Sequence, residues 1–259
     1  MEIPLFQVDA FTKTLFRGNP AAVCPLEYWL HERILQAIAA ENNLSETAFF
    51  VAESDLYELR WFTPKVEVDL CGHATLAAAH VILNHRDPSA SMVRFHTKSG
   101  PLTVSREEDR LVMELPSRPG ALCPGPSNLV RALGFEPLEV YFSRDYLVVA
   151  PKEETVRGLD PDMDLLSKVD GLGVIVTAPG TESDFVSRFF APKVGVPEDP
   201  VTGSAHCTLI PYWSQRLGKK TLHAKQLSLR GGELFCRDEG DRVSIGGHAV
   251  TFLEGRIRF

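Results

Sequence analysis

Short runs in which apolar and polar residues alternate dominate the chain. Alternation with a period of two, bounded by turn residues, is typical of half-buried β-strands. These runs predict strands at Ile3–Phe11, Thr47–Ala52, Glu58–Phe62, Val93–His96, Leu102–Arg106, Arg110–Glu114, Leu147–Ala150, Gly173–Thr177, Phe185–Phe190, Gln226–Leu229, Glu233–Arg237, Arg242–Gly246 and Ala249–Leu253.

Runs with helical character are fewer than the strand-like ones. They predict helices at His31–Asn42, Thr75–Asn84, Ser127–Gly134 and Ala205–Leu217. Gly134 and Gly218 suit the left-handed residue that commonly ends a helix. The helix from Thr75 is apolar on all sides, and such a helix is buried.

An internal repeat is the most informative feature of the chain. Arg60–Val68 (RWFTPKVEV) matches Arg188–Val196 (RFFAPKVGV). Cys71–Ala74 (CGHA) then matches Thr202–Ala205 (TGSA), with a three-residue insertion in the second copy, and each copy continues into an apolar helix. Chance similarity is the alternative to duplication, but the shared order of the blocks favours duplication. Two copies predict two similar lobes with a cleft between them.

The domain organisation follows from this repeat. We expect an N-terminal lobe over residues 1–116 and a C-terminal lobe over residues 117–259, with a return of the last few residues to the first lobe left open. The segment Pro116–Pro126 is rich in proline and glycine and is predicted to be the linker. Many strands around one buried helix predict a barrel-like α+β unit, present twice.

Composition excludes several classes of function. The net charge of −7 gives no sign of the basic patch that a nucleic-acid-binding surface needs. No apolar run is long enough for a membrane span. The five cysteines are odd in number, scattered and without metal-ligand spacing, so we expect free thiols, no metal site and a reducing, cytoplasmic setting.

The two predicted helix starts are the candidate binding elements. A helix start carries unpaired backbone N–H groups and a positive partial charge, and glycine lets a ligand approach the backbone closely. Backbone groups at Gly72, Ala74, Gly203 and Ala205 could therefore hold a carboxylate. The alternative is that both glycines only make tight turns.

Two titratable residues are candidate proton-transfer groups. Glu46 is a lone carboxylate entering an apolar strand, where burial would raise its pKa toward that of a general base. A surface glutamate is the alternative. His73 stands at the helix start and could relay a proton, or be a satisfied structural histidine.

Three further polar residues have two interpretations each. Asp199 precedes the second helix start and could bind a substrate amine or form an ordinary Asp-Pro turn. Ser204 could donate its hydroxyl to a carboxylate or cap its helix. Asn19 could bind substrate or fix the loop after the first strand.

At these residues the chain resembles the PhzF, or phenazine biosynthesis-like, family. The matching segments span nearly the whole chain and are weakest around residues 115–170. They are Asp9–Phe11, Phe16–Val23, Asn43–Phe49, Arg60–Pro64, Glu67–Thr75, Phe190–Pro192, Glu198–His206, Tyr212–Gln215, Gly218–Lys220 and Arg230–Leu234.

The resemblance implies a diaminopimelate-epimerase-like fold with the site between two lobes. The catalytic glutamate of the family falls on Glu46, and its supporting histidine, aspartate and serine fall on His73, Asp199 and Ser204. It further implies a cofactor-independent isomerase that moves a proton on a small, amino-acid-like carboxylate substrate, without metal or nucleotide, and that is commonly a homodimer.

Two other functions remain open on the same fold. Related epimerases and racemases use two opposed thiols; Cys71 meets the first position, but the repeat pairs it with Thr202, which cannot serve as the second. A one-thiol epimerase, racemase or dehydratase using Cys71 is therefore one alternative. A non-catalytic binding protein is the other, because folds host unrelated functions.

Overall fold

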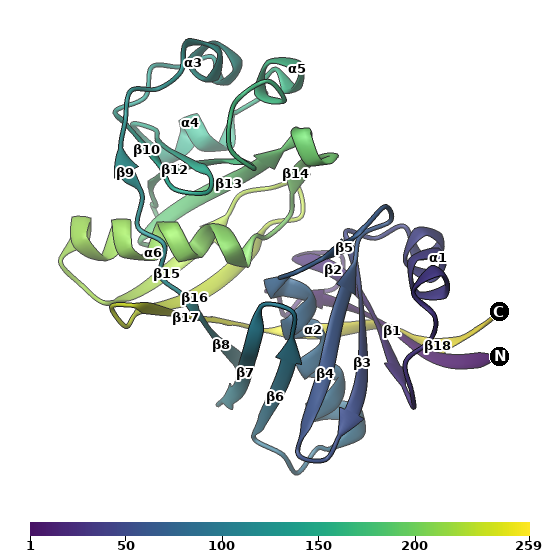
Figure 1. The fold of residues 1–259 in the computed structure, drawn as a ribbon. Coiled ribbons are helices and arrows are strands. Elements are labelled where there is room, and N and C mark those ends of the chain that lie inside the picture. Colours follow the sequence, from purple (N-terminus) through teal and green to yellow (C-terminus); the bar gives the residue numbers. More distant parts are fainter. The chain divides into compact units, whose positions relative to one another are not determined.

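The protein is described by a computed structural model that covers residues 1–259. The chain divides into two compact units, each with its own core (Figure 1). Unit 1 is Met1–Glu114 together with Gly246–Phe259, and unit 2 is Leu115–Ile245. The last residues thus return to the N-terminal unit.

Unit 1 is a sheet around a short helix. Its elements are β1 (Glu2–Ala10), β2 (Asn19–Leu26), α1 (Glu32–Asn42), β3 (Glu46–Glu53), β4 (Leu56–Phe62), β5 (Glu67–Val68), α2 (Gly72–Val81), the π-helical η1 (Ile82–Arg86), β6 (Met92–Thr97), β7 (Gly100–Glu107), β8 (Arg110–Pro116) and β18 (Ala249–Arg258). β1 lies between β2 and the returning β18 and is antiparallel to both. β2 runs parallel to β3 and β4 runs parallel to β6.

Unit 2 repeats this plan. Its elements are β9 (Ala121–Leu122), α3 (Ser127–Leu133), β10 (Glu139–Phe142), β11 (Tyr146–Val149), α4 (Glu153–Arg157), α5 (Met163–Leu166), β12 (Val174–Pro179), β13 (Phe185–Ala191), the 3₁₀-helical η2 (Pro192–Val194), β14 (Val196–Asp199), α6 (Gly203–Leu217), β15 (Thr221–Gln226), β16 (Gly232–Asp238) and β17 (Arg242–Gly247). β10 and β11 are antiparallel, β11 and β12 parallel, and β13 and β15 parallel. These three pairs have the same relative strand directions as the pairs β1–β2, β2–β3 and β4–β6 of unit 1.

Individual side-chain contacts are also repeated in the two units. Arg60 forms a two-pronged ion pair with Glu67 and lies over the ring of Phe62, 5.1 Å from its centroid. Arg188 does the same with Glu198 and lies 4.9 Å from the centroid of Phe190. Because guanidinium and carboxylate meet in a fixed fork, each pair sets the distance between neighbouring strand segments.

The loops that lead into the two buried helices are held by matched hydrogen bonds. The Ser99 hydroxyl donates to the carbonyl of Asp69 at 2.7 Å, and the Ser228 hydroxyl donates to the carbonyl of Pro200 at 2.8 Å. Each bonded carbonyl lies two residues before the helix N-cap, Cys71 or Thr202. The repeat in the sequence is therefore a repeat of structure.

Helices α2 and α6 occupy the cores of their units. All of α2 is buried except for the partly exposed His80, which confirms the prediction from its uniformly apolar sequence. Pro211 interrupts α6, and since proline has no N–H, the carbonyl of Cys207 lacks its helical partner. The backbone N–H of Arg118 bonds this carbonyl at 2.9 Å, which anchors the preceding segment on α6.

Several local predictions are wrong. No strand is predicted over Asn19–Leu26, but this segment is the strand β2, which is buried on both faces and therefore lacks alternation. The predicted strand Gln226–Leu229 ends at its first residue, and Leu229 is 94% exposed. The predicted linker Pro116–Pro126 contains the short strand β9, which pairs with β10. The predicted helix from Thr75 begins earlier, at Gly72.

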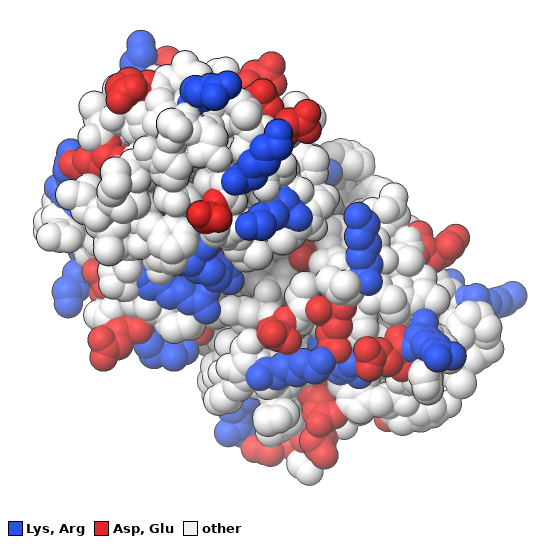
Figure 2. Space-filling view, turned by 45° about the horizontal axis from the view of Figure 1, so that its top comes forward, with Lys and Arg blue, Asp and Glu red and all other residues white.

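Figure 2 shows acidic and basic side chains interspersed over the face that it views. No helix combines the length and apolar character required to cross a bilayer.

Gly18, next to Asn19, allows a prediction about the backbone. Its φ is +64°, and an added Cβ would lie 2.1 Å from the carbonyl oxygen of Ala10. Gly134 has a similar φ of +71° but open space around the Cβ position. We expect Gly18→Ala to lower the free energy of unfolding by about 2–5 kcal/mol, from strain plus overlap, and Gly134→Ala by about 1–2 kcal/mol, from strain alone. Urea unfolding of both variants measures this, and equal losses would contradict the steric argument.

Candidate active site

Three elements of unit 1 bring their polar ends together. β2 and β3 run parallel, with Ala21 opposite Glu46, so Asn19 and Glu46 both stand at the beginning of adjacent strands. The third element is the start of α2, with Cys71 as its N-cap and His73 in its first turn. The local sequence dictates this arrangement, since Glu46 begins its strand directly after the turn that ends α1.

His73 is the centre of this cluster. It is 4% exposed, and its Nε2 lies 3.1 Å from Oε2 of Glu46. Nδ2 of Asn19 lies 3.1 Å from Nδ1, and the Cys71 sulfur lies 3.5 Å from the same atom. Because an amide offers both a donor and an acceptor, Asn19 can serve either protonation state of the ring.

Glu46 retains an unused acceptor in this site. Its side chain is 17% exposed, and Oε2 is buried. The 3.1 Å approach of His73 has the distance of an ion pair but not the direction of a hydrogen bond, so Oε2 lacks a hydrogen-bond partner. A buried carboxylate oxygen without a partner is costly and points to function.

The charges of the cluster favour an imidazolium. Burial alone would lower the pKa of His73, but the adjacent Cys71 sulfur and Glu46 carboxylate outweigh burial and raise the pKa well above its usual value. Burial, assisted by the charge of Glu46, raises the pKa of the Cys71 thiol to about 11. Burial and Glu46 thus oppose ionisation of Cys71, whereas Cys71 and Glu46 together favour protonation of His73.

Glu46, Cys71 and His73 could also hold a metal ion. One ligand atom from each lies within 4.8 Å of the others, and the thiolate, imidazole and carboxylate types suit zinc. The sequence predicts no metal site, because positions 46, 71 and 73 have none of the usual ligand spacings. The fold creates this grouping by placing the start of β3 against the start of α2.

Unit 2 contains the matching loop before α6. Asp199, the last residue of β14, accepts a hydrogen bond from the Thr202 hydroxyl at 2.5 Å. The buried Gln226 accepts from the backbone N–H of Thr202 at 2.9 Å and donates to the carbonyl of Asp199 at 2.8 Å. Asp199 thus takes part in the turn, as one of its two interpretations predicts.

The helix start of α6 differs from that of α2 in its chemistry. Ser204 occupies the position of His73, and its hydroxyl accepts from Arg144 at 3.1 Å. His206 occupies the position of Thr75, and Nδ1 of His206 lies 2.8 Å from the carbonyl of Thr202, just as the Thr75 hydroxyl donates to that of Cys71. Burial lowers the pKa of His206 to about 4, so this histidine is neutral at neutral pH.

The predicted site residues thus divide between the two units. Unit 1 contains Asn19, Glu46, Gly72, His73 and Ala74. The structure brings the side chains of Asn19, Glu46 and His73 together. The residues of unit 2 are Asp199, Gly203, Ser204 and Ala205, which flank or begin α6. Sequence reasoning missed Gln226 and Arg144, whose contacts depend on strands distant along the chain.

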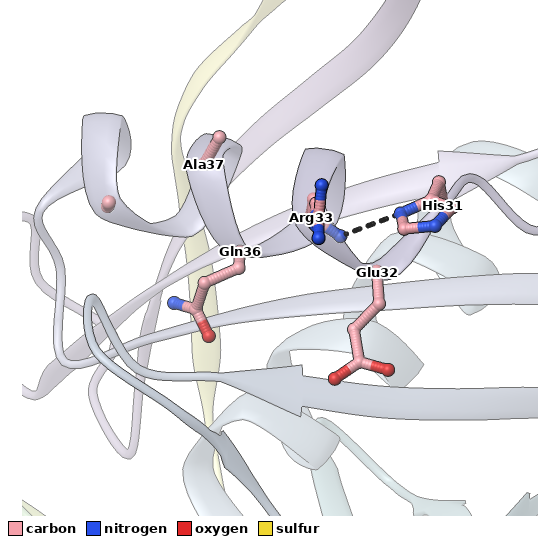
Figure 3. Close-up of a pocket in the computed structure, with 6 residues that line it drawn as sticks. His31, Glu32, Arg33, Gln36 and Ala37 are labelled. Atoms are coloured by element: carbon pink, nitrogen blue, oxygen red, sulfur yellow. Dashed lines mark hydrogen bonds between the residues drawn. The ribbon is translucent and has the colours of Figure 1, made fainter.

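A shallow hollow elsewhere in unit 1 carries no comparable chemistry. It has a volume of about 560 Å³ and follows the first turns of α1, where His31 accepts from the backbone N–H of Arg33 (Figure 3). It contains none of the clustered residues Glu46, Cys71 and His73.

Comparison with known proteins identifies the family. The model of the phenazine biosynthesis-like proteins matches residues 8–255. The chain belongs to the PhzF family. An uncharacterized isomerase of Pseudomonas aeruginosa is 54% identical over 259 residues, covering 100% of this chain and 99% of that protein. Since this and a further isomerase of Halalkalibacterium halodurans, 47% identical, match end to end, the predicted isomerase class is confirmed.

Solved structures support the same fold. A PhzF family protein of Enterococcus faecalis has a TM-score of 0.98 and 48% identity, with 100% of both chains covered. A hydroxyproline epimerase of Agrobacterium vitis has a TM-score of 0.63 at 9% identity, covering 99% of this chain and 92% of that one, and shares the fold alone. The predicted diaminopimelate-epimerase-like α+β fold is confirmed.

The raised pKa of His73 predicts how stability changes with pH. A group that binds its proton more tightly in the folded state contributes stability that is complete below its unfolded pKa, about 6.5, and is lost as pH rises through the folded pKa. The stability difference between the wild type and His73→Gln should therefore shrink with rising pH, by at most about 1.4 kcal/mol per unit.

Urea unfolding of both proteins between pH 5 and 9 measures this difference. Taking the difference cancels the contributions of His80 and His206, whose pKa values burial lowers to about 4. A difference that grows with pH would show that the ring is held neutral.

Proposed function

We propose that this PhzF family isomerase moves a proton on a small, amino-acid-like carboxylate substrate, with Glu46 as the general acid and base. The observation that carries the proposal is the buried Oε2 of Glu46, which lies 3.1 Å from His73 and has no hydrogen-bond partner. This oxygen atom is therefore available to accept a proton from a C–H group of the substrate.

The proposed step conserves charge and atoms. Glu46 takes a proton from the carbon beside the substrate carboxylate, the C–H bonding pair moves into the conjugated system, and the proton returns to another carbon. The unpaired N–H groups at the start of α2 would stabilise the negative charge that develops. His73 keeps the carboxylate of Glu46 in place through the close contact between the two charged groups.

The carboxylate beside the reacting carbon is proposed to bind at the start of α2, at the backbone N–H groups of Gly72 and Ala74. The start of α6, at Gly203, Ser204 and Ala205, is proposed to bind an anionic group of its own. Neither helix has a side-chain cap or an acidic residue in its first turn, which favours an anionic ligand. Asp199 is proposed to face the amine of the substrate, and Asn19 to hold His73. The homodimer and the absence of a required metal or nucleotide stay predictions.

A mechanism with two opposed thiols is disfavoured. Thr202 stands at the N-cap of α6, where Cys71 stands at the N-cap of α2, and a threonine hydroxyl cannot replace an acidic thiol. The pKa of Cys71, about 11 through burial, also leaves little thiolate at neutral pH.

Glu46→Gln tests the proposal directly. The amide matches the carboxylate in size but cannot take a proton, so the rate of deuterium incorporation from D₂O into a substrate should fall by about 10²–10⁴-fold. The exchange is followed by NMR with a panel of small unsaturated amino acids, and the wild type identifies those that exchange.

Cys71→Ser is the matched control, since it changes a neighbour of His73 without removing the proposed base. It should keep most of the exchange rate. Loss of exchange in Cys71→Ser with full exchange in Glu46→Gln would transfer the role to the thiol. A wild type that binds but exchanges no candidate would support a binding protein instead.

A further inference from the structure

Two arginines that no motif singles out lie beside the first two turns of α6. Arg118 is fixed there because its backbone N–H bonds the carbonyl that Pro211 leaves unpaired. Arg144, in the bend between β10 and β11, donates from Nη2 to the hydroxyl of Ser204 at 3.1 Å. Both arginines belong to unit 2, so their arrangement depends on that unit alone.

Several polar atoms of these arginines and of the neighbouring Asp145 lack hydrogen-bond partners. Nη1 of Arg118 and Nε of Arg144 are buried without hydrogen-bond partners, although the latter lies 3.4 Å from Oδ2 of Asp145. Oδ1 of the buried Asp145 is also without a partner. Unsatisfied guanidinium N–H groups are costly when buried, and an oxyanion is the ligand that their geometry matches.

The charge of the cluster favours an anion. Two arginines face one carboxylate, Asp145, which leaves an excess of one positive charge. Burial raises the pKa of Asp145 against the opposing charges of Arg144 and Arg118, and burial raises that of Cys207 to about 11 against the same two arginines. Both guanidinium groups therefore act on the same small region of α6.

Ser204 adds a hydroxyl group to this cluster. Because its oxygen accepts from Arg144, its hydroxyl proton is directed away from the guanidinium and is free to be donated to a ligand. The first turn of α6 adds unpaired N–H groups and contains no acidic residue.

We propose that Arg144, Arg118 and Ser204 form an oxyanion-binding subsite at the start of α6 that selects substrates with an acidic group in addition to the reacting amino-acid moiety. The role of this subsite in catalysis rests on the proposed function, whereas its ability to bind anions does not depend on that function. A carboxylate and a phosphate ester share the required chemistry.

Calorimetric titration of the full-length protein with malonate and with inorganic phosphate tests the subsite. We expect one of the two anions to bind, and Arg144→Gln to weaken it by about tenfold or more, with Arg144→Lys intermediate because an ammonium cannot form the two-pronged contact. Malonate binding indicates a second carboxylate, and phosphate binding indicates a phosphorylated substrate.

Two further variants separate binding from folding. Asp145→Asn should tighten anion binding, because it removes the one opposing charge, whereas a purely structural cluster would bind no better. The exposed Arg157 pairs only with Glu153 on α4, and Arg157→Gln should leave binding unchanged.

Titrating Glu46→Gln distinguishes this proposal from the proposed function. That variant should bind the anion as the wild type does even though it no longer exchanges protons. Absence of binding by both anions, or equal affinity in the wild type and Arg144→Gln, would overturn the subsite.

Discussion

The close contact between the partly buried carboxylate of Glu46 and the buried imidazole of His73 constrains the arrangement of unit 1. Glu46 and His73 can lie 3.1 Å apart only because β3 begins where α2 begins. That coincidence requires the parallel pairing of β2 with β3, the Arg60–Glu67 fork beside it and the hydrogen bond from Ser99 to the loop before α2. The sheet and the central helix together hold this carboxylate and imidazole largely out of bulk water.

Duplication explains why the two units resemble one another and where they diverge. The fork, the aromatic ring beneath it and the loop bond recur in unit 2 with Arg188, Phe190 and Ser228. The first helical turn does not recur: a charged histidine in one unit stands where a serine bonded to Arg144 stands in the other. Under the two proposals made above, one copy of the unit moves protons and the other binds an anion, which is an asymmetry that an enzyme with two opposed thiols would not show.

Much of the fold could be predicted from the sequence. Strands with one solvated face show an alternation of apolar and polar residues, and two helices end at Gly134 and Gly218, both in the left-handed backbone conformation. The strand β2 could not be predicted, since burial on both faces removes alternation and its two prolines suggest a loop. For the site, Glu46 and His73 could be singled out from the repeat and the family resemblance. The buried Gln226 and Arg144 could not, because their partners Thr202 and Ser204 are brought to them by strand pairing. For the same reason no spacing rule reveals the Glu46, Cys71 and His73 grouping.

The coupling between Glu46 and His73 is the claim on which the account depends. A ¹⁵N NMR titration of the His73 ring in the wild type and in Glu46→Gln measures that coupling without any substrate. The account predicts a pKa for His73 well above the usual 6.5 in the wild type and a clear fall in the variant, because burial then acts with one opposing charge removed. An unchanged His73 pKa in Glu46→Gln, or a wild-type value below 6.5, would contradict it.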